Sequence, residues 1–139
     1  MIRGPAAGSA PADAVWNLIA RPDQWHRWSP HVRGAEGLGT PEVRAGASGH
    51  VVLVGGAKLP AEILSVEPGR SWTWRVGGLV LEHIVTTAPD EVKLEMPVRA
   101  TRPLWKPVAA AYQPVVNLIA RRIVRLAERD GLAEYPSLR

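Results

Sequence analysis

The last long stretch of the chain, from Leu104 to Arg129, constrains the fold most, because its pattern predicts a single helix with one apolar side. Apolar residues recur there at steps of three and four, the spacing of one helix face. They are Val108, Tyr112, Val115, Ile119, Ile123 and Leu126. Pro114 should bend this helix and Gly131 should end it. A helix with one apolar stripe needs an apolar surface to cover it.

The middle of the chain supplies strands for that surface. Short segments rich in Val, Ile, Leu and Trp alternate with Gly, Pro and Asp turns. They predict strands at 32–38, 48–55, 58–67, 70–77, 79–87 and 91–100. The short connections favour an antiparallel meander. Before it, residues 1–9 suit only a short edge strand, because they are rich in Gly and Pro. Two short helices should follow, one of about ten residues after Pro11 and one from Asp23 to Trp28.

Alternation within the strands indicates which side chains face the core. Trp72 and Trp74 alternate with polar neighbours, so both should point to the buried side. The 79–87 strand is ambiguous, since Leu81, His83 and Val85 compete with the set that contains Glu82. We expect the His83 set to face inward, because Glu82 then stays in water.

Length and composition limit the number of domains and exclude several kinds of site and partner. The 139 residues suit one domain, 1–139, and the absence of cysteine excludes disulfides and thiolate metal sites. A net charge of +4 is modest, and a solvated basic helix face is its commoner cause, so we expect no nucleic-acid partner. No apolar run is long enough to cross a bilayer, and the N-terminus lacks the layout of a signal peptide. We therefore expect a cytoplasmic protein.

Several short motifs, in their order, resemble a known family. They are Ala10-Pro11, Val15-Trp16, Pro22-Asp23-x-Trp25-x-x-Trp28-Ser29-Pro30 and Glu67-Pro68-Gly69-Arg70-x-x-x-Trp74. Together they resemble the polyketide cyclase/dehydrase-like (SRPBCC) branch of the START-related superfamily. The resemblance implies an α+β helix-grip fold. In this fold a curved antiparallel β-sheet wraps around a long C-terminal helix, and two short helices follow the first strand. The chain departs from its relatives at Asp90-Glu91-Val92, where they often carry Gly-x-Thr.

The resemblance also implies a cavity between the sheet and the last helix that holds a small hydrophobic or aromatic, lipid- or polyketide-like molecule. We expect its walls to include Trp28, Trp72, Trp74, His83, Met96, Val98, Trp105, Tyr112, Val115 and Ile119. Trp105 could gate the cavity or only pack the helix start. The scattered histidines, His26, His31, His50 and His83, have no metal-site spacing, so we expect neither a metal nor another cofactor.

Two other functions stay open at this point. A cyclase or dehydratase would hold a polyketide-like chain in a reactive shape, with His83 or Tyr112 moving a proton, although no catalytic residue is assigned. A protein-interaction module with a filled core would instead use the basic helix face. Whether the protein is an enzyme, and whether it forms a homodimer, are likewise open.

Overall fold

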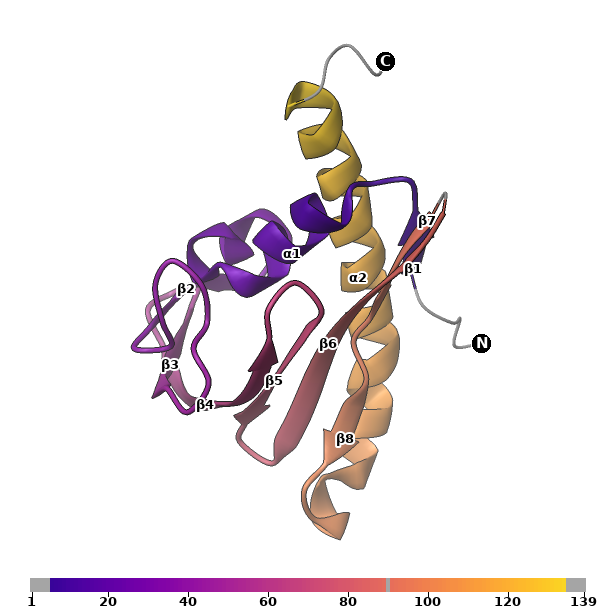
Figure 1. Cartoon of the computed structure of the whole chain (residues 1–139). Helices are drawn as coiled ribbons and strands as arrows, with labels where there is room; N and C mark the ends of the chain where they lie inside the picture. Colours follow the sequence, from indigo (N-terminus) through magenta and orange to yellow (C-terminus); the bar gives the residue numbers. More distant parts are fainter. Residues whose placement is uncertain (1–5, 90, 135–139) are drawn as a thin grey trace.

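The computed structural model describes residues 6–89 and 91–134, and it shows a curved antiparallel sheet with a long helix across it (Figure 1). Its elements are β1 (Ala6–Gly8), α1 (Ala12–Ala20), η1 (Pro22–Arg27), β2 (Val32–Glu36), β3 (Ser48–Leu53), β4 (Lys58–Glu67), β5 (Ser71–Val76), β6 (Leu79–Ala88), β7 (Glu91–Glu95), β8 (Val98–Ala100), η2 (Pro103–Trp105) and α2 (Lys106–Glu134). The helix-grip prediction is confirmed.

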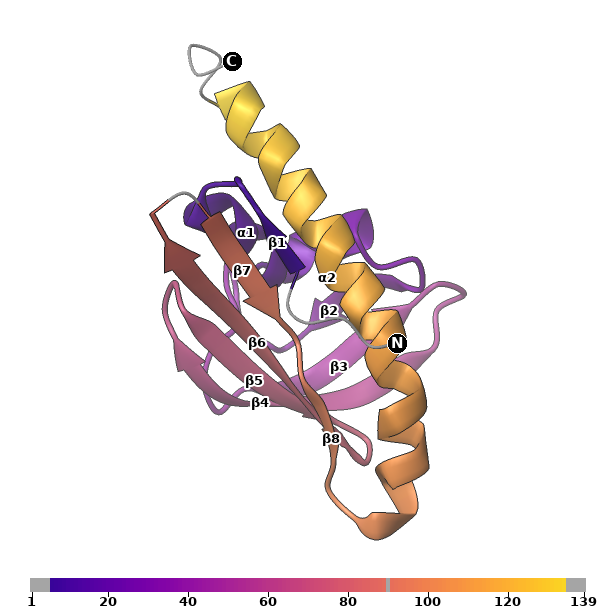
Figure 2. The ribbon, with the colours of Figure 1, turned by 90° about the vertical axis from the view of Figure 1, so that its right-hand side faces the viewer.

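The strands form a meander whose two ends differ. The order is β1-β7-β6-β5-β4-β3-β2, with β8 also paired to β6. β1 adds to the edge beside β7, where Ala6 lies opposite Leu94, as the sequence predicts for a short edge strand. The part of that predicted strand before Ala6 lies outside the described residues. α2 crosses the end of the sheet made by β1, β7 and β8, as Figure 2 shows, and makes its main contacts there rather than with β2–β5.

The last predicted strand, 91–100, is divided in two at Pro97. Proline has no N–H to donate, so it interrupts the ladder with β6. The Gln113 side chain of α2 covers the interruption: its Nε2 donates to the Met96 carbonyl oxygen at 3.0 Å, and its Oε1 accepts from the Val98 N–H at 2.7 Å. The helix therefore supplies hydrogen bonds at the break between β7 and β8.

The buried face of α2 differs from the predicted stripe. Val108 and Val115 were expected to face the sheet, and this is wrong, because they are 45% and 43% exposed. The apolar side chains buried along the described part of α2 are those of Ala109, Val116, Ile119, Ala120, Ile123, Val124 and Ala127. Three of these seven are alanines, so small side chains let the helix approach the sheet closely. A search for large apolar side chains misses such a face.

The predicted end of α2 at Gly131 is also wrong, since the helix continues to Glu134. Gly131 serves packing instead: a Cβ there would lie 2.6 Å from Cδ of Pro11. A bidentate ion pair from Arg27 to Asp130, with both N–O distances 2.9 Å, fastens η1 to the same end of α2. The helix also continues on both sides of Pro114 (Figure 2).

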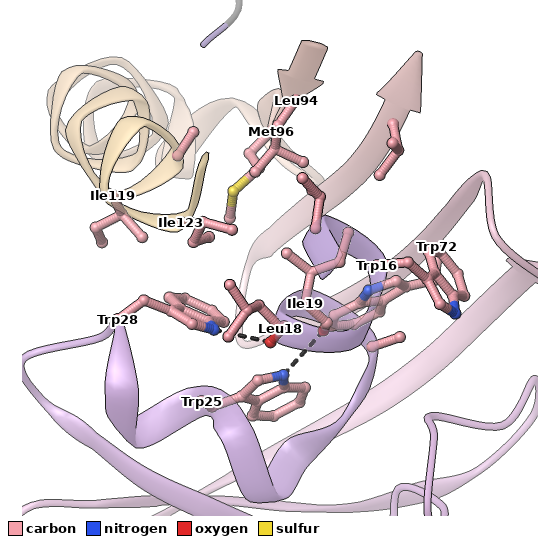
Figure 3. Packing of buried hydrophobic residues seen from close by; sticks show 14 of the residues in the cluster. Trp16, Leu18, Ile19, Trp25, Trp28, Trp72, Leu94, Met96, Ile119 and Ile123 are labelled. Atoms are coloured by element: carbon pink, nitrogen blue, oxygen red, sulfur yellow. Dashed lines mark hydrogen bonds between the residues drawn. The ribbon is translucent and has the colours of Figure 1, made fainter. Parts of the chain in front are cut away.

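The core fills the space between α1, η1, the inner face of the sheet and the second half of α2. Figure 3 shows Trp25 and Trp28 pointing back to α1, where their Nε1 groups donate to the carbonyl oxygens of Ile19 (2.9 Å) and Leu18 (2.8 Å). Trp25 also stacks on Trp72, with ring centroids 5.7 Å apart. The two tryptophans of the motif after Pro22 thus join η1 to α1 and to β5 within the core.

Candidate functional site: an apolar hollow beside α2

A hollow lies on the inner face of β2–β6, against the first half of α2. Its outer part has a volume of about 340 Å³. It is lined by His31, Val32, Val51, Leu53, Leu59, Pro60, Trp74, Val76, Gly77, Leu79, Leu81, Trp105 and Tyr112. Nearly all of these side chains are apolar, and the volume falls within the range of small-molecule sites.

A smaller space of about 50 Å³ lies deeper, toward the core. It is bounded by Trp25, Trp28, Ser29, His31, Val32, Trp72, Trp74, Leu81, His83, Met96, Tyr112, Val116 and Ile119. The two spaces adjoin, because Trp74, Leu81 and Tyr112 line both. Ser29, Trp72 and His83 line only this inner space, so their polar groups belong to the deeper, closed end of the hollow.

Strand register sets this closed end. Trp72 pairs with His83 and Trp74 with Leu81 across β5 and β6, and all four line the inner space. The His83 ring stacks on the Trp72 indole at a centroid distance of 3.8 Å. His83 is 2% exposed, so the prediction that its set faces inward is confirmed.

His83 is neutral at neutral pH. Its Nδ1 lies 3.1 Å from the Trp72 carbonyl oxygen. Because a carbonyl only accepts, Nδ1 carries the hydrogen and Nε2 holds a free lone pair. Burial lowers the pKa of His83 to about 3, outweighing the hydrogen bond to Trp72, which acts in the opposite direction. The ring can therefore accept a hydrogen bond but is a poor base.

Two of the indoles that line the hollow carry an N–H group without a partner among the described residues. The Nε1 atoms of Trp72 and Trp74 are buried and make no hydrogen bond with the described residues. By contrast, Trp16 donates to the Glu42 carboxylate at 3.1 Å. An unsatisfied buried N–H costs about 1–3 kcal/mol, so an acceptor that reached Trp74 would relieve part of that cost.

Trp105 lines the hollow and lies directly on the β5–β6 turn. A Cβ at the buried Gly78 would lie 2.2 Å from two atoms of the Trp105 ring. The indole can take this position only because residue 78 has no side chain. Trp105 thus lines the hollow where the chain enters α2, a placement that fits either role considered for it from the sequence.

The Gly78→Ala variant should displace Trp105. We expect the 19F resonance of 5-fluorotryptophan-labelled Trp105, assigned with Trp105→Phe, to shift, and the free energy of unfolding to fall by about 1–3 kcal/mol through overpacking. Gly34→Ala is the matched control, because a Cβ there meets nothing within 4 Å. An unmoved resonance in Gly78→Ala would show that the ring does not rest on this turn.

The predicted wall residues divide into two groups. Those that line the hollow are Trp28, Trp72, Trp74, His83, Met96, Trp105, Tyr112 and Ile119. Val98 and Val115 line neither space: Val98 packs half-buried against the core, and Val115 faces outward. The wall from β2–β4, which includes Val51, Leu53 and Leu59, was not predicted from the sequence. The available signal was that Val51 and Leu53 stand two residues apart in a predicted strand and so share one of its faces. His31 is exposed and also borders the hollow.

Comparison with solved structures supports the fold. Protein MLL2253 of Mesorhizobium loti matches with a TM-score of 0.66 at 15% identity, covering 91% of this chain and 96% of that one. CalU16 of Micromonospora echinospora matches at 0.58 and 20% identity, covering 93% and 83%. The Aha1 dimer from Colwellia psychrerythraea matches at 0.69 and 10% identity, covering 91% and 95%. At such identities the likeness shows the fold alone.

Comparison at the level of sequence gives the family. No curated protein matches the chain at a significant level. No described helix is both long and apolar enough to cross a membrane. The sequence profile of one family, described as polyketide cyclase / dehydrase and lipid transport, matches residues 8–133, which is nearly the whole chain. The chain therefore belongs to the polyketide cyclase/dehydrase and lipid transport family of the START-related superfamily.

Proposed function

We propose that the protein binds one small, mostly apolar molecule, lipid- or polyketide-like, in the hollow between the sheet and α2. The observation that carries the proposal is the outer space of about 340 Å³ with its apolar lining. Burial of apolar ligand surface would supply the affinity, at about 25 cal/mol per Å² before ordering costs. The family description, which includes both polyketide enzymes and lipid transport, agrees with a ligand of this kind.

The closed end of the hollow favours a ligand with one polar group. Trp74 offers an unpaired N–H donor, and its ring offers a flat apolar surface. His83 and Tyr112, which carry a ring nitrogen acceptor and a hydroxyl, line the same space. An aromatic molecule with a carbonyl or hydroxyl oxygen would satisfy Trp74 while its body fills the apolar outer part.

Binding is better supported than catalysis by these groups. A cyclase or dehydratase would need His83 or Tyr112 to move a proton. Burial lowers the pKa of His83 to about 3, so at pH 7 this ring is neutral and a weak base. Burial raises the pKa of Tyr112, so its hydroxyl keeps its proton and is a weak acid. An interaction module with a filled core fits less well, because the outer space is open.

Titration with 1-anilinonaphthalene-8-sulfonate, followed by displacement with fatty acids and aromatic polyketides, tests the proposal. We expect saturable one-to-one binding, and Trp74→Ala should weaken it at least about tenfold through lost apolar contact. Native mass spectrometry of the purified protein gives an independent readout of any retained molecule.

The matched control is Trp16→Ala, which removes a buried indole that does not line the hollow. Both variants must first show folded far-UV circular dichroism. Equal loss of binding in the two variants, or no saturable binding by the wild type, would contradict a site in the hollow.

A further inference from the structure

The outer face of α2 and the preceding η2 carry a row of exposed apolar side chains. Leu104 is 84% exposed, Val108 45%, Val115 43% and Leu118 62%. They recur at steps of four, seven and three, with the exposed Ala111 between Val108 and Val115, so they share one helix face. We call Leu104, Val108, Val115 and Leu118 the outer stripe. No described residue covers it, and an exposed apolar row of this kind marks an interaction surface.

The segment of the chain that carries the outer stripe has charges of one sign. Residues 96–127 contain six Lys and Arg residues and no Asp or Glu. The cations are Arg99, Arg102, Lys106, Arg121, Arg122 and Arg125. Arg102 and Lys106 are exposed on either side of Leu104 in the chain, and Arg122 and Arg125 continue the same helix face beyond Leu118. The partner should therefore be apolar in part and negatively charged.

We propose that the outer stripe and its cations dock the protein on the surface of a membrane that contains anionic lipid. A helix with Leu and Val on one side and Lys and Arg around them lies in the interface between headgroups and acyl chains. Lys and Arg near an anionic leaflet add attraction that falls with salt. Trp105, adjacent to Leu104, lines the hollow, so docking sets the rim of the hollow against the lipid.

A second copy of this chain is a poorer occupant. Pairing two outer stripes would bring the cations of both copies into one interface, and residues 96–127 have no carboxylate to offset them. Like charges placed together across an interface oppose association. Nucleic acid would match the cations but would leave the apolar stripe without a partner.

Vesicle co-sedimentation tests the proposal without any ligand in the hollow, so its outcome is separable from that of the proposed function. Vesicles of equal parts phosphatidylglycerol and phosphatidylcholine should bind the wild type at low salt, and phosphatidylcholine alone should bind it far less. Leu104→Asn with Leu118→Asn should weaken binding at least about tenfold. Arg102→Gln with Lys106→Gln should weaken it roughly fivefold per cation.

The chain offers matched controls for both variants. Leu64→Asn changes a leucine on β4 that is 41% exposed, and Arg44→Gln with Arg70→Gln removes two exposed cations outside residues 96–127. These should bind like the wild type. No binding to anionic vesicles, or equal loss in the controls, would overturn the proposal. A dimer in light scattering that Leu104→Asn with Leu118→Asn abolishes would also overturn it and assign the stripe to a second copy.

Discussion

The free energy of unfolding is expected to fall by about 2.5 kcal/mol between pH 6 and pH 4 through His83 alone. The His83 pKa is about 3 in the folded protein and about 6.5 when unfolded. Below pH 6.5 the unfolded chain therefore binds the extra proton, and protons favour unfolding. The stabilisation from His83 is fully present above pH 6.5 and is lost as the pH falls toward 3. Denaturant unfolding at several pH values measures this dependence.

The His83→Gln variant isolates the contribution, since carboxylates also titrate in this range. Gln can still donate to the Trp72 carbonyl oxygen but has no proton to gain. The free energy of unfolding of the wild type minus that of the variant should therefore fall as the pH falls from 6 to 4, because only the wild type loses the His83 contribution. A difference that stays constant over this range would show that His83 is protonated equally in both states.

The Trp25→Ala variant should lose about 3–5 kcal/mol of stability, a large share of the total for a domain of this size. Trp25 is 1% exposed, stacks on Trp72, meets Trp74 edge-on at 5.1 Å, and donates to the Ile19 carbonyl oxygen. Its removal opens a large cavity between η1 and β5 and leaves that oxygen unpaired. Thermal and denaturant unfolding measure the loss.

Trp25→Phe separates packing from hydrogen bonding. The ring keeps most of the stacking area but lacks the N–H, so the expected loss is about 1–2 kcal/mol. If Trp25→Ala cost no more than Trp25→Phe, the indole stack would contribute little and the hydrogen bond to Ile19 would carry the effect.

Features set by residues close together in the chain, such as alternation along a strand or a turn residue, could be predicted from the sequence. The inward placement of Trp72 and His83 followed from alternation along a strand, and the turns followed from Gly and Pro. The bounds of β4 agree with the predicted 58–67. These features are local, so residue type and spacing determine them.

Features that depend on close contact between distant segments could not be predicted in the same way. The buried face of α2 is rich in alanine because β1 and β8 approach it closely, and nothing within the helix reveals that approach. Gly131 looked like a helix stop, whereas it makes room for Pro11. The wall of the hollow from β3 and β4 likewise depends on how the sheet curves, which single-strand patterns leave open.

The two hydrogen bonds from Gln113 to the break between β7 and β8 hold α2 against the sheet on one side of the hollow. Pulling α2 away from β8 would expose the Met96 carbonyl and the Val98 N–H at once, so this side resists opening. On the opposite side α2 has no contact of comparable extent with β2–β5. To bind a larger ligand, the β3–β4 hairpin and Trp105 would therefore move outward, while α2 stays in place.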